Sequence, residues 1–168
     1  MKLGLFVAAI AVAALSGCSS SDSSSSGKTG PVASTPLEGT IDGKPFEGKF
    51  ARAQKGFGAS DDGEVSIDIF EKDVPCDSFE QTTEPYVLLS VPWKAGTARD
   101  FKFASKPEGQ TATFVIQKDG KTDNVISVEG RVEIVDAPTE KGATGKLRLR
   151  ATAEGNNVEG EVPVKVCE

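Results

Sequence analysis

Cysteine is the residue type with the most chemistry to offer in this sequence. The chain of 168 residues contains three cysteines, Cys18, Cys76 and Cys167, and no histidine. Without histidine, Ser-His-Asp and Cys-His catalysis are excluded, and so is the usual imidazole ligation of zinc, copper or haem. The remaining thiol chemistry is lipidation or disulfide formation. We therefore predict no catalytic residues, no cofactor and no metal site, and a chain that is not an enzyme.

Pairs of aspartates are the other candidates for chemistry, as calcium ligands or as paired carboxylates. None of the pairs has the ligand spacing of a calcium-binding loop. Most fall in expected turns, where an aspartate side chain hydrogen-bonds the local backbone. We interpret them as turn residues; they are Asp61 with Asp62, Asp73 with Asp77, and Asp119 with Asp123.

Cys18 directly follows a short apolar segment. Lys2 precedes the apolar residues 3–15, a run too short for a bilayer, which needs about 20 apolar residues, but typical of a secretory signal. The sequence LSGC at residues 15–18 resembles the lipobox of bacterial lipoproteins. The resemblance implies that residues 1–17 are removed as a signal peptide and that Cys18 carries a diacylglyceryl group, usually with a further acyl chain such as palmitate. An ordinary signal peptide with a coincidental cysteine is the alternative.

Lipidation of Cys18 would make the membrane a partner of this chain. Two or three acyl chains anchor a protein stably, whereas one chain holds it only marginally. Ser19, and not an aspartate, follows the cysteine, which in diderm bacteria resembles lipoproteins sent on to the outer membrane. The expected location is therefore the bacterial cell envelope, lipid-anchored at the outer membrane. The net charge of −6 argues against nucleic acid as a partner, because phosphate backbones attract basic surfaces.

The rest of the chain divides into a linker and one domain. Serine dominates the residues after Cys18, and a segment with so few apolar residues cannot offset the entropy of ordering. We expect residues 18–35 to be the lipidated cysteine and a flexible linker. Residues 36–168 have the composition and length of a single β-domain with one core.

Apolar and polar residues alternate through this domain with the period of two that indicates β-strands. Strands are expected at residues 36–42, 45–54, 64–71, 86–92, 99–105, 111–118, 124–136, 145–153 and 158–166. Segment 124–136 is the clearest, with one face formed by Ile126, Val128, Gly130, Val132 and Ile134. Asp-Gly pairs between such segments favour tight hairpin turns. The pattern predicts an all-β fold, an antiparallel β-sandwich, with a β-barrel as the alternative.

The last expected strand, 158–166, carries two further signals. Pro163 cannot donate a ladder hydrogen bond, so we expect this strand at a sheet edge. If the sequence EGNN closes the hairpin before it, Arg150 lies near Glu161 on the outward face.

Cys76 and Cys167 are the two thiols that remain after Cys18 in an exported chain. Their simplest interpretation is a disulfide that ties the end of the chain to the loop after segment 64–71. A redox-active pair is disfavoured by the lack of a CxxC motif, and two thiolates alone do not complete a tetrahedral zinc site.

The domain as a whole also carries a resemblance. Its segments LEGTIDGKPFEGKFARAQ and EVSIDIF, the mid-chain cysteine and the final VEGEVPVKVC resemble small lipoproteins of myxobacteria and related diderm bacteria. The resemblance supports the topology and the disulfide, and since that group has no assigned activity it implies nothing catalytic.

Two functions are compatible with these features. The first is a membrane-anchored envelope lipoprotein whose non-enzymatic β-domain makes structural contacts or binds an envelope protein of unknown identity. The alternative is a module that binds a small apolar ligand, in a cavity lined by Phe101, Phe103, Phe114 and Leu88. A filled interior favours the first function, and such a cavity favours the second.

Overall fold

The computed structural model describes residues 30–55, 63–77, 82–102 and 111–167. The expected signal peptide, Cys18 and residues 19–29 of the expected linker lie outside this part of the chain. Within it the chain forms strands and no helix. The strands are β1 (Leu37–Ile41), β2 (Lys44–Gly48), β3 (Phe50–Gln54), β4 (Glu64–Phe70), β5 (Tyr86–Pro92), β6 (Ala98–Lys102), β7 (Ala112–Lys118), β8 (Lys121–Ile126), β9 (Glu129–Asp136), β10 (Thr144–Ala153) and β11 (Asn156–Val166).

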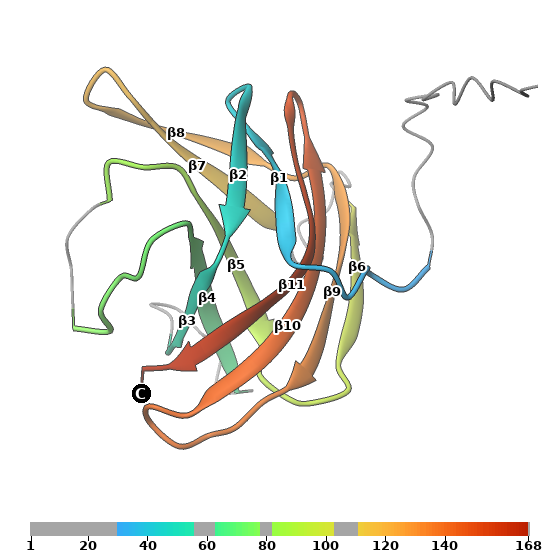
Figure 1. Ribbon diagram of the computed structural model, residues 1–168. Helices are drawn as coiled ribbons and strands as arrows, with labels where there is room; N and C mark the ends of the chain where they lie inside the picture. The colour runs from blue at the N-terminus through green and yellow to red at the C-terminus, as the bar shows by residue number, and fades with distance from the viewer. Residues whose placement is uncertain (1–29, 56–62, 78–81, 103–110, 168) are drawn as a thin grey trace, which may run out of the picture.

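Hydrogen bonds join these eleven strands into one sheet that curls around an apolar core (Figure 1). The order along the sheet is β6-β9-β10-β11-β3-β4-β5-β7-β8, and β1 pairs with β11 and β2 beside this path. Neighbouring strands are antiparallel, except that β3 and β11 run parallel. The predicted all-β class is confirmed, in the form of an open half-barrel with β9 and β10 on one side of the core and β4 and β5 on the other (Figure 1).

Alternation along each strand determines which side chains fill the curl. β-branched and other apolar residues suit a pleated surface that is buried on one side. The expected alternation is confirmed in four of the predicted segments, where residues at every second position are buried: Ile67 and Ile69, with the partly buried Val65 packed against the core; Ala112, Phe114 and Ile116; Leu147, Leu149 and Ala151; Val158, Gly160, Val162, Val164 and Val166.

Two hairpins turn on Asp-Gly pairs, as the sequence predicts. Asp42 and Gly43 join β1 to β2 with φ of 51° and 72°, and Asp119 and Gly120 join β7 to β8 with φ of 52° and 72°. Positive φ at both central residues is the signature of a type I′ turn, whose twist matches that of the flanking strands.

The expected strand 124–136 bends, and its predicted inward face is wrong at the bend. It forms β8 and β9, divided at Ser127-Val128, where the amide of Ser127 donates to β7 and that of Val128 to β10. Ser127 is fully buried, whereas Ile126 and Val128 are 44% and 52% exposed. The extra residue at the bend moves the inward-facing side chains from odd-numbered positions in β8 to even-numbered positions in β9. The chain thereby passes from one side of the curled sheet to the other.

The expected strand 45–54 divides in the same way, into β2 and β3. The amide of Lys49 donates to the carbonyl of Phe70 at 3.0 Å, which turns the chain from β1 toward β4. Gly48 lets the chain pass close to Leu37 here, since a Cβ atom at this position would lie 2.2 Å from Cδ2 of Leu37 and would force that side chain to move.

β11 lies inside the sheet, so the predicted edge position of this strand is wrong. It pairs with β10 on one side, and on the other with β1 and then β3. The amide of Glu161 donates to Thr35 and that of Cys167 to Ala53, and Pro163 falls between these two contacts. At Pro163, β11 passes from pairing with β1 to pairing with β3. The backbone nitrogen at this position needs no hydrogen-bond partner, so a proline is tolerated.

The charged pairs on the outer face of β10 and β11 are shifted from the predicted register. Arg148 faces Glu161 and Arg150 faces Glu159, so the expected Arg150–Glu161 pair is wrong by two residues. The turn that closes this hairpin consists of Glu154 and Gly155, one step earlier than the sequence EGNN suggested.

Candidate functional site

The described residues contain a covalent link between distant parts of the chain. Cys167 directly follows β11, and Cys76 lies in the loop after β4. Their sulfur atoms are 2.06 Å apart and their Cα atoms 5.2 Å apart, at the distances expected of a disulfide. The amide of Cys167 also donates to the carbonyl of Ala53 on β3 at 2.8 Å. The link therefore fastens the end of the chain at the point where β11 and β3 pair.

Arg52 on β3 positions the loop that carries Cys76. Its Nε donates to Oδ2 of Asp68 on β4 at 3.0 Å, and its Nη1 donates to the carbonyl of Pro75 at 3.1 Å. The guanidinium also lies over the ring of Phe70, 5.2 Å from the ring centre. An ion pair, a backbone hydrogen bond and a cation–π contact thus converge on one side chain.

Asp68 is a buried carboxylate in this cluster. It is 6% exposed, and Gln54 Nε2 is a second donor to its Oδ2, at 3.4 Å. Burial raises the pKa of Asp68 above its ordinary value, because desolvation outweighs the stabilisation by Arg52. Burial likewise raises the pKa of the nearby Tyr86, whose ring packs against Phe70 with centroids 5.3 Å apart. The cluster holds a loop in place, and its geometry offers no nucleophile beside a base.

A surface pocket of about 370 Å³ lies beside this cluster, lined by Phe70 and by loop residues 71–75 and 82–85. Lys72 and Glu84 form an ion pair between the two loop segments. None of the lining residues belongs to the core cluster, so the pocket lies outside the curl of the sheet.

The aspartate pairs are dispersed. Asp119 occupies its hairpin turn, and Asp61 and Asp62 lie outside the described residues. Among the residues that the structure describes, no three side chains of His, Cys, Asp or Glu gather closely enough to hold a metal ion.

The four residues suggested for an apolar cavity do not come together in the described part. Phe114 belongs to the core, whereas Leu88 pairs with Thr113 and therefore lies on the outer face of the sheet. Phe103 lies outside the described residues, as does the side chain of Phe101. Trp93 is partly buried against the core, and its Nε1 donates to the carbonyl of Pro138 at 2.7 Å.

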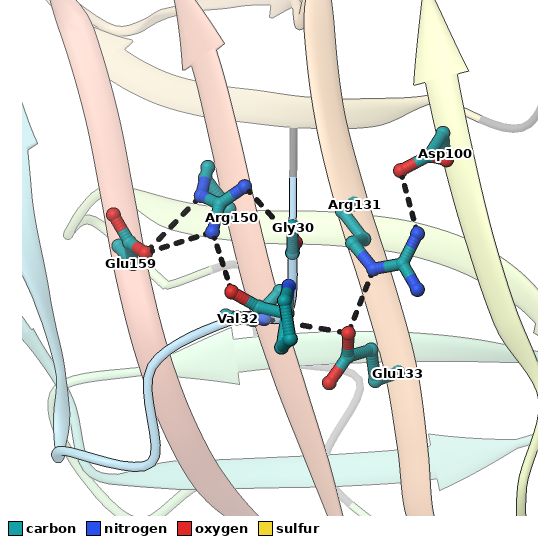
Figure 2. A network of polar contacts seen from close by, with 8 residues as sticks. Gly30, Val32, Asp100, Arg131, Glu133, Arg150 and Glu159 are labelled. Carbon is teal, nitrogen blue, oxygen red and sulfur yellow. Dashed lines mark hydrogen bonds and ion pairs between the residues drawn. The ribbon is translucent and has the colours of Figure 1, made fainter. Parts of the chain in front are cut away.

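A further site, which the sequence analysis did not predict, lies on the outer face of β9 and β10. Residues 30–36 (the strap) lie against this face, although residues 30–35 were expected to be flexible linker (Figure 2). Nη2 of Arg150 donates to the carbonyl of Pro31 at 2.9 Å, and the amide of Val32 donates to Oε1 of Glu133 at 3.3 Å. The side chain of Val32 is 3% exposed.

Neighbouring charges hold the two side chains that contact the strap. Arg150 bonds Glu159 on β11, and Glu133 accepts a 2.7 Å hydrogen bond from Arg131, which also reaches Asp100 on β6 (Figure 2). These bonds raise the pKa of Arg131. The only sequence signal for the strap is Val32, an isolated apolar residue in a serine-rich region.

The fold and these contacts define a disulfide-linked all-β domain with its N-terminal segment strapped to the sheet. No family model matches the chain, and neither the curated proteins nor the solved structures compared with it include a match. The described residues form no helix of the length and apolarity needed to cross a bilayer.

Proposed function

We propose that this chain is a lipid-anchored lipoprotein of the bacterial cell envelope whose β-domain makes non-enzymatic contacts. The observation that carries the proposal is the sequence LSGC at residues 15–18, directly after an apolar segment that is too short to span a bilayer. In this proposal Cys18 carries the lipid, residues 1–17 are removed, and the protein resides at the outer membrane.

The form of the domain supports a role in contacts. Apolar side chains fill the inside of the curl, among them Phe46, Phe114, Ile134 and Leu147, each fully buried. The link between Cys76 and Cys167 suits a domain that works outside the cytosol, where disulfides persist. A filled and cross-linked domain is a stable platform for binding another envelope component through its surface.

The alternative of a small apolar ligand is less well supported. Phe114 and Leu88 point to opposite faces of the sheet, and the 370 Å³ pocket is bordered by an ion pair and by acidic loop residues. Sites for apolar ligands are lined mainly by hydrophobic side chains, with few polar groups.

Replacement of Cys18 tests the anchor. We expect Cys18→Ser to abolish processing at residue 17 and partitioning into a detergent phase, because the lipid has no other attachment point. Ser19→Ala, next to it, is the matched control and should be processed and lipidated normally. Mass spectrometry of the mature N-terminus gives the readout, and normal lipid mass or partitioning of Cys18→Ser would refute the proposal.

A second variant tests the location. Ser19→Asp should shift the lipidated protein from the outer to the inner membrane fraction, whereas Ser19→Ala should leave it in place. Recovery of Ser19→Ala in the inner membrane fraction would contradict the outer-membrane assignment, and equal distribution of both variants would contradict the role of residue 19 in it. Cross-linking of the anchored protein in intact envelopes, followed by purification, would then identify the contacted component.

A further inference from the structure

The strap is bound by a site that several parts of the sheet build together. On β11, the amide of Glu161 donates to the carbonyl of Thr35 at 2.7 Å, and Pro36 forms a β-bridge with the same residue. On β10 and β9, Arg150 and Glu133 hold the backbone at Pro31 and Val32. The strap thus contacts three adjacent strands, through Gly30 to Val32 at one end and Thr35 and Pro36 at the other.

The lack of a side chain at Gly160 and the burial of Val32 show that the site is shaped for this segment. A Cβ atom at position 160 would lie 2.4 Å from the carbonyl oxygen of Pro36, so the strap passes where only Gly160 leaves room. At the other end, Val32 is buried against the outer face, outside the main core cluster. Burial of a valine side chain contributes to binding because it removes apolar surface from water.

Docking of the strap sets the number of residues between Cys18 and the point where the chain meets the sheet. Eleven residues, 19–29, remain between the cysteine and Gly30, where the contacts with the sheet begin. Fully extended, a chain of this length reaches about 40 Å. If the strap were released, the segment between Cys18 and the sheet would extend to residue 35 and could reach about 60 Å.

These lengths determine which face of the domain can lie against a bilayer. A domain of this size has a diameter of roughly 36 Å from the scaling of the radius of gyration, and half its circumference is about 57 Å. A tether of about 40 Å that leaves the domain at Gly30 cannot pass around to the face formed by β4 and β5. A tether of about 60 Å can do so.

We infer that the outer face of β9, β10 and β11 is a binding site for the chain's own residues 30–36, and that docking of this strap turns the β9–β10 face toward the membrane. The opposite face, formed by β4 and β5, is then presented to partners. The orientation rests on the proposed lipid anchor at Cys18, whereas the docking of the strap does not.

Hydrogen exchange of the full chain tests the docking, whether or not the purified protein carries a lipid. We expect the amides of Val32 and Glu161 to be protected, and to exchange at least tenfold faster in Val32→Asp, which places a charge in the buried position. Val135→Asp is the matched control, since Val135 is an exposed valine on β9. The amide of Val166, which donates to Ala143, should stay protected in all variants.

A second pair of variants separates release of the strap from general damage to the sheet. Arg150→Gln removes the bond to Pro31, whereas Arg148→Gln removes an ion pair with Glu161 on the same face and contacts no strap residue in the described bonds. Only Arg150→Gln should accelerate exchange in the strap. Unprotected strap amides in the native chain, or equal effects of both variants, would overturn the docking.

Fluorescent labels test the orientation in vesicles that contain nitroxide-labelled lipids. A label at Val135→Cys on β9 should be quenched at least threefold more than one at Ser90→Cys, on the outer face of β5. Arg150→Gln should reduce this difference, and Arg148→Gln should preserve it. Equal quenching at both positions in a protein with a protected strap would overturn the orientation, whereas failure of the chain to bind vesicles at all would refute the anchor itself.

Discussion

The Cα atoms of Cys76 and Cys167 lie 5.2 Å apart, although the two cysteines are 91 positions apart in the sequence. The segment between them contains β5 to β11, so the link encloses most of the sheet. It lies next to the short parallel pairing of β3 with β11, in which Val164 to Val166 face Ala51 to Ala53. The disulfide therefore closes the fold beside one of its long-range strand pairings.

Removal of this link should lower the free energy of unfolding substantially. We expect Cys76→Ser combined with Cys167→Ser to cost about 2 to 5 kcal/mol, because the unfolded chain regains the entropy of an open loop. Urea unfolding with and without reductant measures the effect. Reductant should destabilise only the native chain and leave the double variant unchanged, and two free thiols in unfolded, unreduced protein would contradict the prediction.

Gly39 on β1 is expected to tolerate no side chain. A Cβ atom at this position would lie 1.9 Å from the carbonyl oxygen of Asn157 on β11, and backbone cannot yield as a flexible side chain can. We expect Gly39→Ala to lower the free energy of unfolding by about 1 to 3 kcal/mol, the range for overpacking. Glu38→Ala, at the exposed neighbouring position, is the control and should change the melting temperature little.

The all-β class was predictable because the alternation of apolar and polar residues directly reflects burial on one side of a strand. The Asp-Gly hairpins followed from the tolerance of these two residues for positive φ. The bend at Ser127-Val128 was not predictable, because the alternation continues through it and only the change of neighbouring strand shifts the inward face. The inner position of β11 was missed for a related reason, since Pro163 occupies a gap that arises only when β1 and β3 both pair with this strand.

Of the candidate sites, the disulfide could be predicted from the sequence and the strap could not. Two remaining thiols in an exported chain allow one intramolecular pairing, so Cys76 and Cys167 could be paired without a structure. The strap could not be found in this manner, because Arg150 and Pro31 are 119 residues apart and meet only through the order of the strands. Composition indicated a linker there, and the contacts that hold residues 30–36 come from β9, β10 and β11.

Glu161 should make the stability of the domain depend on pH in the acid range. Hydrogen bonds from Lys146 and Arg148 lower its pKa below the ordinary 4.5. A lowered pKa of a carboxyl group contributes stability that is present above the unfolded pKa and is lost as the pH falls through the folded pKa. Glu161→Gln should therefore cost about 1 kcal/mol at neutral pH and flatten the decline in stability between about pH 5 and pH 3. Glu154→Gln, in the exposed β10–β11 turn, should leave the decline unchanged when urea unfolding is compared across this range.

Arg52 and Asp68 should show strong energetic coupling. Arg52→Gln leaves a buried carboxylate without its cation, a change that typically costs about 3 to 5 kcal/mol, and it also loosens the loop at Pro75. The pKa of Asp68 is already raised by burial, and loss of Arg52 removes the interaction that opposes this rise. Because a raised carboxyl pKa makes the folded state bind protons more readily than the unfolded state, the cost of Arg52→Gln should shrink as the pH falls through the pKa of Asp68.

The double variant Arg52→Gln, Asp68→Asn should recover much of the loss at neutral pH, since no buried charge remains. A double-mutant cycle by urea unfolding at neutral and mildly acidic pH measures this coupling, and additive costs that do not change with pH would show that the pair is not coupled.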